Sequence, residues 1–288
     1  MPLFSIVIPV FNRASTVLST LESVYKQRFK NFEVIVIDDG SSDALVNSLS
    51  EYLNQPNFLY HYQPNAGVSA ARNTGVTLSC SEYLVFLDSD DYVTENWLLD
   101  YANEIEATHP DLIYCGINRM NEDIVVAYTD PRNPFGNGVD VGNVIPGSFC
   151  IRRSFFDLVG GYDSQISYGE NTELGFRIKQ NNPTIEFIST PNLLYTMQEF
   201  SHGKNVRNKM NGLVYTIQKH STLFNQNSSM KKRFLSIAGV SAIQCSEFRK
   251  AQALFWEALL TKPLSIESVF RYLVSLSPSV SKKMWKGK

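Results

Sequence analysis

The chain of 288 residues lacks a long hydrophobic run and a paired cysteine motif. No segment approaches the roughly 18 consecutive apolar residues that a membrane-spanning helix needs. The N-terminus has no basic cluster and Pro9 interrupts its apolar run, so we expect no signal peptide. These absences predict a cytoplasmic protein. We expect the four cysteines, which form no CxxC pair, to be reduced, buried and structural: Cys80, Cys115, Cys150 and Cys245.

Glycine-rich phosphate-binding motifs are also absent. A dinucleotide-binding G-x-G-x-x-G would follow the first expected strand, but no glycine precedes Gly40. No G-x-x-x-x-G-K-[ST] motif occurs either. The net charge of −2 gives no electrostatic argument for a nucleic-acid partner. The hydrophobic content of 43% and the charged content of 19% are ordinary for a globular protein.

The first half of the chain alternates short apolar runs with helix-like segments. This alternation predicts an α/β fold with a mostly parallel sheet flanked by crossover helices. A short helix is expected to begin at Asp43 or a neighbouring serine, either of which can cap it, and to run towards Leu53. Expected strands lie at 4–10, 32–37, 58–62, 83–87 and 112–117, and expected helices at about 14–28, 69–78 and 95–108.

The pattern changes after the fifth expected strand. Residues 118–143 are rich in Gly, Pro, Asn and Asp, which predicts turns, short strands and a mobile loop. Strand signals disappear after Gly203, so we expect a helical C-terminal extension at 204–288. Between these regions, order is expected to return at 146–153, followed by a helix at about 172–180 and short strands at 185–188 and 193–195.

Three carboxylates, Asp88, Asp90 and Asp91, follow the apolar run at 83–87. Carboxylates this close repel one another unless a cation neutralises them, and oxygen ligands suit Mg²⁺ or Mn²⁺. Open α/β sheets bind ligands at strand ends. The cluster therefore predicts a metal site that keeps positions open for substrate phosphates, with a solvated acidic turn as the alternative.

Two further residues stand at neighbouring strand ends. Phe11 follows the first expected strand and Asp39 follows the second. An aromatic face can stack on a nucleobase, and a carboxylate can accept a hydrogen bond from a ring N–H. The pair suits uracil or another base with an N–H edge. The alternative is that Phe11 belongs to the core and Asp39 forms a turn.

The segment from Asn65 to Gly75 combines a turn with the start of a helix. Asn65 to Gly67 forms the expected turn, and Ser69 can cap the helix. Arg72 lies one turn inside this helix and can reach a nucleotide or the carboxylate cluster. A surface ion pair is the alternative for Arg72.

Seven segments, in this order, resemble family 2 glycosyltransferases of the GT-A fold from Ser5 to about Ile178: SIVIPVFN, VIVIDDGSSD, NAGVSAARNTG, YLVFLDSDD, PGSFCIRR, VGGYD and GENTELGFR. The resemblance implies a GT-A domain at 1–203, with a nucleotide-binding half at 1–117 and an acceptor half at 118–203. It implies a metal-dependent, inverting transferase that uses a nucleotide-diphosphate sugar, expected to be UDP-linked. The expected acceptor is a glycan or lipid-linked glycan in surface polysaccharide synthesis, such as lipopolysaccharide.

The resemblance also implies roles for individual residues. The nucleotide would be held by Pro9, Val10, Phe11, Asn12, Asp39, Asn65, Gly67, Arg72, Asp88 and Ser89. The Mn²⁺ or Mg²⁺ ion would be bound by Asp90, assisted by Asp88 or Asp91, with His202 as a further candidate. The acceptor or sugar would contact Gly147, Ser148, Arg152 and Asn171, with Arg153 as a neighbouring candidate.

The expected general base departs from the family pattern. The family commonly places Glu-Asp or Asp-Asp at the start of a helix after VGGYD, with the Asp as base, whereas this chain has Glu170 and Asn171. An amide cannot take up the proton, so Glu170 inherits the role if the enzyme is active. Glu173, one helical turn on, and loss of activity are the alternatives, and Glu170 could also be a carboxylate that the helix dipole favours.

Two other functions and one partner stay open at this point. Asn171 motivates a non-catalytic sugar-nucleotide-binding module. A nucleotidyltransferase shares the base-binding logic, but the chain lacks its glycine-rich loop after the first strand.

Residues 247–260 and 265–276 are expected to form a helical pair. The tail has Lys282, Lys283, Lys286 and Lys288 beside Met284 and Trp285, which suits an anionic membrane surface or a solubilising tail.

Overall fold

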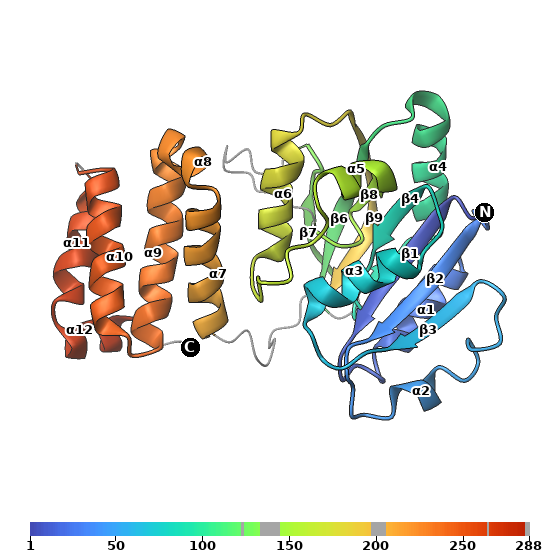
Figure 1. Cartoon of the computed structure of the whole chain (residues 1–288), viewed down its shortest axis with the longest axis horizontal. Helices are drawn as coiled ribbons and strands as arrows, with labels where there is room; N and C mark the ends of the chain where they lie inside the picture. Colours follow the sequence, from blue (N-terminus) through green and yellow to red (C-terminus); the bar gives the residue numbers. More distant parts are fainter. Residues whose placement is uncertain (122–123, 133–144, 197–205, 264, 286–288) are drawn as a thin grey trace. The chain divides into compact units, whose positions relative to one another are not determined.

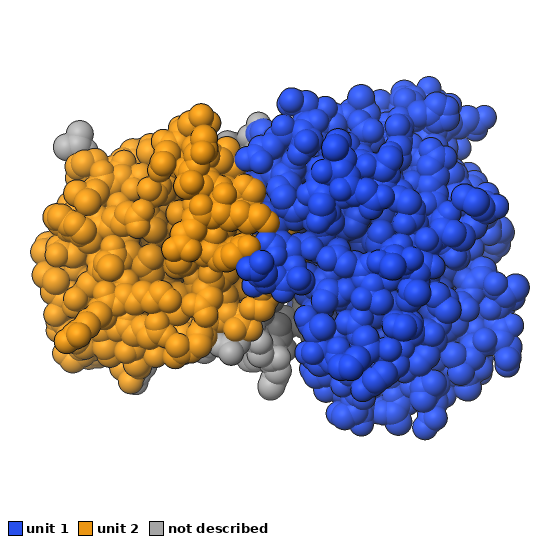
Figure 2. All heavy atoms as spheres, in the orientation of Figure 1, with its two compact units in different colours: residues 1–165, 171–199 blue, residues 166–170, 200–288 orange. Residues whose placement is uncertain are grey.

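The computed structural model describes residues 1–121, 124–132, 145–196, 206–263 and 265–285. The chain forms two compact units (Figure 2). Unit 1 consists of Met1–Gln165 and Asn171–Glu199, and unit 2 of Ile166–Glu170 and Phe200–Lys288. Within the described residues, no helix is both long and apolar enough to cross a membrane. The functional division at 117 and 203 stays a prediction.

Unit 1 is built on one sheet, whose described strands follow the order β3-β2-β1-β4-β8-β6-β9-β5, with β7 paired to β6 (Figure 1). The strands are β1 Phe4–Val10, β2 Phe32–Asp38, β3 Phe58–Tyr62, β4 Tyr83–Phe86, β5 Tyr92–Val93, β6 Leu112–Asn121, β7 Ile124–Thr129, β8 Phe149–Arg152 and β9 Ile185–Thr196. The helices between them are α1 Val17–Tyr25, α2 Leu45–Ser48, α3 Val68–Leu78, α4 Trp97–Thr108, α5 Arg153–Leu158 and α6 Glu170–Gln180.

The first four strands of that order run parallel, as the alternation of strands and helices predicts. Parallel strands need crossover connections, and α1 and α3 supply two of them. Pro9 lies in the central strand β1, a position that normally excludes proline. It is tolerated because the pairing of β1 with β4 ends at Val7 and Phe86, so no ladder bond needs an N–H from Pro9.

The second half of the sheet is mixed. β8 pairs antiparallel with β4 and β6, whereas β6 pairs parallel with β9. β6 continues to Asn121, beyond the predicted end at residue 117, because β7 and β9 give its later residues backbone partners. The two predicted strands at 185–188 and 193–195 form one strand, β9, with register shifts near Gly116. Most of the predicted loop, at 133–143, lies outside the described residues.

Two buried clusters cover the two faces of the sheet, and β1 contributes to both. Ile6 and Ile8 face the cluster formed with α1 and α4, while Val7 faces the cluster formed with α5 and α6. This alternation follows from the two-residue period of a strand. The continuous apolar sequence of β1 is thus explained by burial on both sides.

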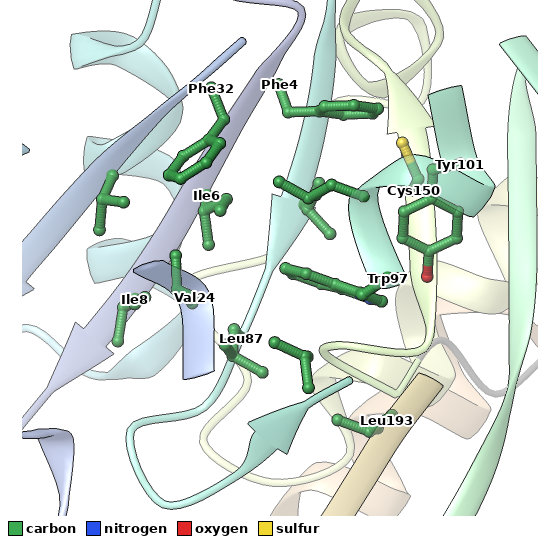
Figure 3. Packing of buried hydrophobic residues seen from close by; sticks show 14 of the residues in the cluster. Phe4, Ile6, Ile8, Val24, Phe32, Leu87, Trp97, Tyr101, Cys150 and Leu193 are labelled. Carbon is green, nitrogen blue, oxygen red and sulfur yellow. The ribbon is translucent and has the colours of Figure 1, made fainter. Parts of the chain in front are cut away.

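Trp97, the first residue of α4, fixes the loop that precedes β8. Its ring lies among Leu87, Leu193 and neighbouring core side chains (Figure 3). Its indole N–H donates to the carbonyl oxygen of Gly147 at 2.8 Å, which satisfies the polar atom of a fully buried ring. The peptide N–H of Gly147 donates to Phe86 O at 2.5 Å, so this loop lies against the end of β4.

Three local predictions are wrong. Asp43 caps no long helix, because its carboxylate accepts a hydrogen bond from Ala14 N at 2.8 Å, and α2 is only four residues long. Ser69 is not the N-cap of α3; Gly67 holds that position, and Ser69 is buried within the first turn. Cys80 is exposed, whereas Cys115 and Cys150 are buried as predicted.

Unit 2 consists of packed helices in its described part, which confirms the predicted helical extension (Figure 1). α9 packs against α7 and α10, and α10 packs against α11. The predicted pair at 247–260 and 265–276 corresponds to α10 and α11. The helices are α7 Val206–Lys219, α8 Ser221–Gln226, α9 Ser228–Gln244, α10 Phe248–Thr261, α11 Ile266–Ser275 and α12 Pro278–Met284.

Close packing of α3 on β1 generates a test of the core. A Cβ atom added at Gly75 would lie 2.3 Å from Val7 Cγ1. We expect Gly75→Ala to lower the free energy of unfolding by about 1–3 kcal/mol, despite the better helix propensity of alanine. Chemical denaturation measures this change. In a double-mutant cycle, Val7→Ala should partly rescue Gly75→Ala, and strictly additive effects would contradict the contact.

Candidate active site

The carboxyl ends of β1, β2 and β4 lie along one edge of the sheet, because these strands are parallel neighbours. Phe11 follows β1 and is 49% exposed, which is unusual for an aromatic residue next to a buried strand. Asp39 follows β2, and the carboxylate cluster follows β4 by one residue. The predicted base-binding and metal-binding residues therefore share one edge.

Hydrogen bonds tie the loop after β1 to the loop after β2. The Asn12 peptide N–H donates to Ser41 Oγ at 3.0 Å, and Asn12 Oδ1 accepts from the Ser42 peptide N–H at 2.8 Å. Asn12 has a φ of 53°, in the left-handed region that asparagine tolerates better than most residues. These bonds hold the loop that presents Phe11.

Asp39 organises the turn that precedes α3. Its carboxylate accepts hydrogen bonds from Ala66 N at 2.8 Å, Gly67 N at 2.9 Å and Gln63 Nε2 at 2.7 Å. The Asn65 side-chain amide donates to the Asp39 carbonyl oxygen at 2.8 Å. Asp39 thus forms the turn predicted for the segment beginning at Asn65, and charge-assisted bonds of this kind are the stronger ones.

Asp38 supports the same region from within the sheet. It is buried and accepts hydrogen bonds from the Ser41 peptide N–H at 2.8 Å and from the Tyr60 hydroxyl at 2.7 Å. Burial, together with this bond to Asp38 and the charge on Asp38, raises the pKa of Tyr60 above its usual range. Tyr60 therefore stays protonated and acts as a donor. This role of Tyr60 leaves no local signal in the sequence, because β3 reads as an ordinary strand.

Arg72 connects three parts of the site. Its side chain is 2% exposed, and Nη2 donates to Asp88 Oδ1 at 2.7 Å. Nη1 lies 3.4 Å from Asn171 Oδ1, and the guanidinium stands 4.9 Å from the centre of the Tyr162 ring. The prediction that Arg72 reaches the carboxylate cluster is confirmed by these distances, and the surface ion pair is excluded by its burial.

The segment around Tyr162 is held by the residue next to Arg72. Asn73 Nδ2 donates to the Tyr162 carbonyl oxygen at 2.8 Å, and Asn73 Oδ1 accepts from the Tyr162 peptide N–H at 3.0 Å. A Cβ at Gly161 would come within 3.0 Å of that same Asn73 oxygen. This role of Asn73 is not predicted from the sequence, although the residue lies inside the NAGVSAARNTG segment.

The carboxylates after β4 differ in exposure. Asp88 and Asp90 have side chains that are 33% and 26% exposed, whereas Asp91 is buried. Arg13 Nη2 lies 3.7 Å from Asp90 Oδ2, a contact for which the sequence gives no local signal. Ser89, which lies between Asp88 and Asp90 in the sequence, is buried. Each partly exposed carboxylate therefore has a guanidinium within ion-pair distance.

These residues fit a divalent ion that takes few protein ligands. Among the residues that the structure describes, no group of three or more His, Cys, Asp and Glu side chains could hold a metal. Mg²⁺ and Mn²⁺ are commonly bound through one or two carboxylates, with phosphates and water completing the coordination. Asp88 and Asp90 match that donor set. His202 lies outside the described residues.

The predicted acceptor residues separate into two groups. Gly147 and Ser148 lie beside the end of β4, where Gly147 adopts a φ of 85° and Ser148 is buried. Arg152 pairs with Tyr83 at the start of β4, and its guanidinium donates to Tyr83 Oη at 3.3 Å and Pro110 O at 3.3 Å. Because β8 runs antiparallel to β4, Arg152 lies at the opposite end of the strand from Asp88, and its predicted acceptor role is not supported.

The neighbouring Arg153 is placed away from the carboxylates for the same reason. Its guanidinium donates to Ser81 O at 2.7 Å and to Val76 O at 3.0 Å, which ties α5 to the loop before β4. Both arginines follow an antiparallel strand, a direction that the local sequence pattern does not reveal. We therefore assign Arg152 and Arg153 a structural role.

The two candidate bases occupy different environments. Glu170 is the first residue of α6 and is partly exposed. Glu173 is fully buried, and its carboxylate is paired with Arg177 through bonds of 2.8 Å and 2.6 Å. Arg177 also donates to Val159 O. A carboxylate held in a buried bidentate pair is stabilised in its charged form and is a poor proton acceptor, so the geometry favours Glu170.

The family model described as Glycosyl transferase family 2 matches residues 5–159. EpsH of Bacillus subtilis (strain 168) is 27% identical over 208 residues, which are 66% of this chain and 59% of EpsH. Glycosyltransferase GlyA of Streptococcus pneumoniae serotype 4 is 33% identical over 119 residues, which are 41% of this chain and 17% of GlyA. The chain therefore spans less than two thirds of the length of these relatives.

Solved structures with the same fold include S. aureus TarS 1-349 in complex with UDP-GlcNAc. The TM-score is 0.66 at 19% identity, and the match covers 99% of this chain and 91% of that one. For S. aureus TarS the TM-score is 0.65, with 96% of this chain and 55% of that chain covered. The predicted GT-A-like α/β fold is confirmed by these matches.

The bonds of Asp39 generate a structural prediction. In Asp39→Asn an amide replaces the carboxylate, so its N–H₂ group faces donors that it cannot satisfy. We expect a loss of about 1–3 kcal/mol of stability and faster amide hydrogen exchange at Ala66 and Gly67. Asp43→Asn is the matched control, since Asp43 accepts one exposed backbone bond. Unchanged exchange at Ala66 and Gly67 would refute the role of Asp39 in the turn.

Proposed function

Because the chain belongs to glycosyl transferase family 2, we propose that it is a glycosyltransferase that moves a sugar from a UDP-linked donor to a glycan or lipid-linked acceptor. The transfer is metal-dependent and inverts the anomeric centre. The acceptor belongs to surface polysaccharide synthesis, such as lipopolysaccharide, and the reaction takes place in the cytoplasm or at the inner face of its membrane. The observation that carries the proposal is the alignment of Phe11, Asp39 and Asp88 at one sheet edge.

The nucleotide lies across the ends of β1 and β2 in this proposal. The exposed ring of Phe11 offers a face for stacking on the base, and stacking of this kind contributes about 1–3 kcal/mol. Asp39 already accepts three hydrogen bonds, so its main contribution is to shape the turn that borders the base. The remaining members of this pocket are Pro9, Val10, Asn12, Asn65 and Gly67.

Asp88 and Asp90 would hold the Mn²⁺ or Mg²⁺ ion. When bound, such an ion neutralises charge that develops on the departing diphosphate. Arg72 keeps Asp88 in place, and Arg13 stands beside Asp90 as a second cation near the phosphates. Buried Asp91 serves the turn rather than the ion, since its peptide N–H donates to Asp88 O at 3.2 Å.

Glu170 acts as the general base. Its carboxylate takes the proton of an acceptor hydroxyl while that oxygen attacks the anomeric carbon, and the bond to the UDP oxygen breaks on the opposite side. This single displacement inverts the anomeric configuration. Asn171, which accepts from Arg72, positions the start of α6 without competing for the proton. Gly147 and Ser148 border the end of β4, where the donor sugar and the acceptor would meet.

A binding module without catalysis is the second candidate function. The observation that favours it is Asn171, a neutral residue where relatives of this kind commonly carry the base. The family match argues against a nucleotidyltransferase. Release of UDP together with free or transferred sugar would support catalysis, whereas donor binding with no release under any tested acceptor would favour the module.

The role of Asp90 leads to a prediction about metal dependence. Asp90→Asn should abolish Mn²⁺-dependent binding of a UDP-sugar, because a neutral amide is a far poorer ligand for a hard cation. Calorimetry with and without Mn²⁺ measures this dependence. Asp130→Asn is the control, since Asp130 is a carboxylate that accepts from Arg132 N in an exposed turn. Unchanged Mn²⁺ dependence in Asp90→Asn would show that the ion is held elsewhere.

The role of Glu170 leads to a prediction about turnover. Glu170→Gln keeps the size of the side chain, so donor affinity should stay near that of wild type while turnover falls about 10²–10⁴-fold. Steady-state release of UDP measures turnover. Glu173→Gln should instead lower the melting temperature, because it leaves the partly buried Arg177 beside a neutral partner.

Two results would overturn the assignment of Glu170. If Glu170→Gln keeps wild-type turnover and Glu173→Gln loses it without loss of stability, the base lies one turn further along α6. If wild type transfers no sugar and Asn171→Asp does, the natural chain is a binding module.

A further inference from the structure

The C-terminal helices of unit 2 expose an apolar face. On α11 the apolar residues recur at intervals of three and four, which places them on one side of the helix. Ile266 is 86% exposed and Leu273 is 58% exposed, far more than an apolar residue in a protein core. We call this surface the α11–α12 face; its exposed residues are Ile266, Val269, Phe270, Leu273, Leu276, Val280 and Met284.

The other side of α11 is already used. Ser268 and Ser275 are buried, and the Tyr272 ring packs against Trp256 of α10 with the ring centres 5.1 Å apart. Glu267 is paired with Lys232 of α9 at 2.9 Å and with Arg271 at 2.7 Å. The acidic residue of this helix is therefore neutralised within unit 2, and the apolar face lies on the side that unit 2 does not cover.

Charge is distributed unevenly along the chain. Residues 248–288 contain eight Lys and Arg residues but two Asp and Glu residues, a net charge of +6. The whole chain has a net charge of −2, so residues 1–247 have −2 − 6 = −8. Lys282 and Lys283 are exposed in the last turn of α12, next to Met284. The apolar face is thus bordered by cations in a chain that is otherwise acidic.

We propose that the α11–α12 face binds the surface of a bilayer that contains anionic lipids. Helices that combine an exposed apolar side with flanking lysines lie in the membrane interface, with the apolar side at the level of the upper acyl chains. The ten residues of α11 extend about 15 Å, half the hydrocarbon thickness, so the helix lies on the bilayer and does not cross it. Anionic head groups complement the excess of lysine and arginine.

A second copy of the chain fits this face less well. Two copies that met through it would bring two net positive segments together, and like charges at close range oppose association. An anionic lipid surface supplies the opposite sign over the whole area. The proposal does not depend on the sugar-transfer chemistry, because the face lies on α11 and α12 and none of its residues has a role in the proposed reaction. Binding of the chain to a membrane would bring it close to a lipid-linked acceptor.

Vesicle co-sedimentation of the full chain tests the proposal. Wild type should bind vesicles of phosphatidylcholine with phosphatidylglycerol, bind pure phosphatidylcholine much more weakly, and be released as NaCl is raised. Phe270→Ser with Leu273→Ser should reduce the partition coefficient at least about tenfold, through loss of apolar burial. Lys282→Gln with Lys283→Gln should reduce it about fivefold for each lysine.

Val125→Ser with Val126→Ser is the matched control. These side chains on β7 are also about half exposed, at 51% and 50%, but lie in unit 1, so vesicle binding should not change. Circular dichroism checks that the variants are folded, and the lysine variants keep the test decisive if the serine variants unfold. Brominated lipids should quench the fluorescence of exposed Trp256 and leave that of buried Trp97.

Three outcomes would overturn the proposal. The first is wild type that does not bind phosphatidylglycerol vesicles. The second is equal loss of binding in the control variant. The third is a dimer in sedimentation equilibrium that Phe270→Ser with Leu273→Ser converts to monomers, in the absence of vesicle binding; the face would then be an interface between copies of the chain.

Discussion

A buried guanidinium sets the main constraint on the site. Arg72 is almost fully shielded from water, and a charge in that position is costly unless it is paired and hydrogen-bonded. Asp88 supplies the opposite charge, Asn171 supplies an amide oxygen, and Tyr162 supplies an aromatic face. These three partners come from the loop after β4, from α6 and from the segment before α6. Satisfying one cation thus fixes three segments that are far apart in the sequence.

The same constraint explains why Asn171 can stand at a position where the family commonly has an aspartate. An aspartate at position 171 would place a second carboxylate beside Arg72, and the two carboxylates would share one cation. With Asn171, the positive charge of Arg72 is directed to Asp88, and the amide still accepts a hydrogen bond. Replacement of the usual residue is therefore compatible with a proton acceptor one position earlier.

The predictable part of the fold is the part in which local sequence and tertiary environment agree. β1, β2 and β3 are buried or half-buried strands that end in turn-forming residues, and their limits match the prediction to within a residue. The limits of β6 and β9 could not be predicted, because both strands are extended by pairing with segments distant in the sequence. Ser69 is of a residue type that commonly caps helices, but Asp39 already accepts the hydrogen bond of the Gly67 N–H at the start of α3.

The predicted site residues follow the same division. Residues directly after parallel strands, such as Phe11, Asp39 and Asp88, lie where strand direction places them. Arg152 is misplaced in the prediction because β8 runs antiparallel, and strand direction cannot be read from a short apolar run. Arg13 and Tyr60 were missed, since each acts through a carboxylate on another segment. Polar partners of this kind are set by tertiary contacts and leave no local pattern.

The helical extension also has a physical connection to the proposed base. Residues 166–170 belong to unit 2, whereas Asn171 belongs to unit 1, so the peptide bond between Glu170 and Asn171 joins the two units. Within unit 2, a Cβ at Gly212 of α7 would lie 2.3 Å from Tyr168 O, a distance that only glycine permits. Lys209 Nζ stands 5.7 Å from the centre of the Tyr168 ring. Within unit 2, α7 therefore packs against the backbone two residues before Glu170.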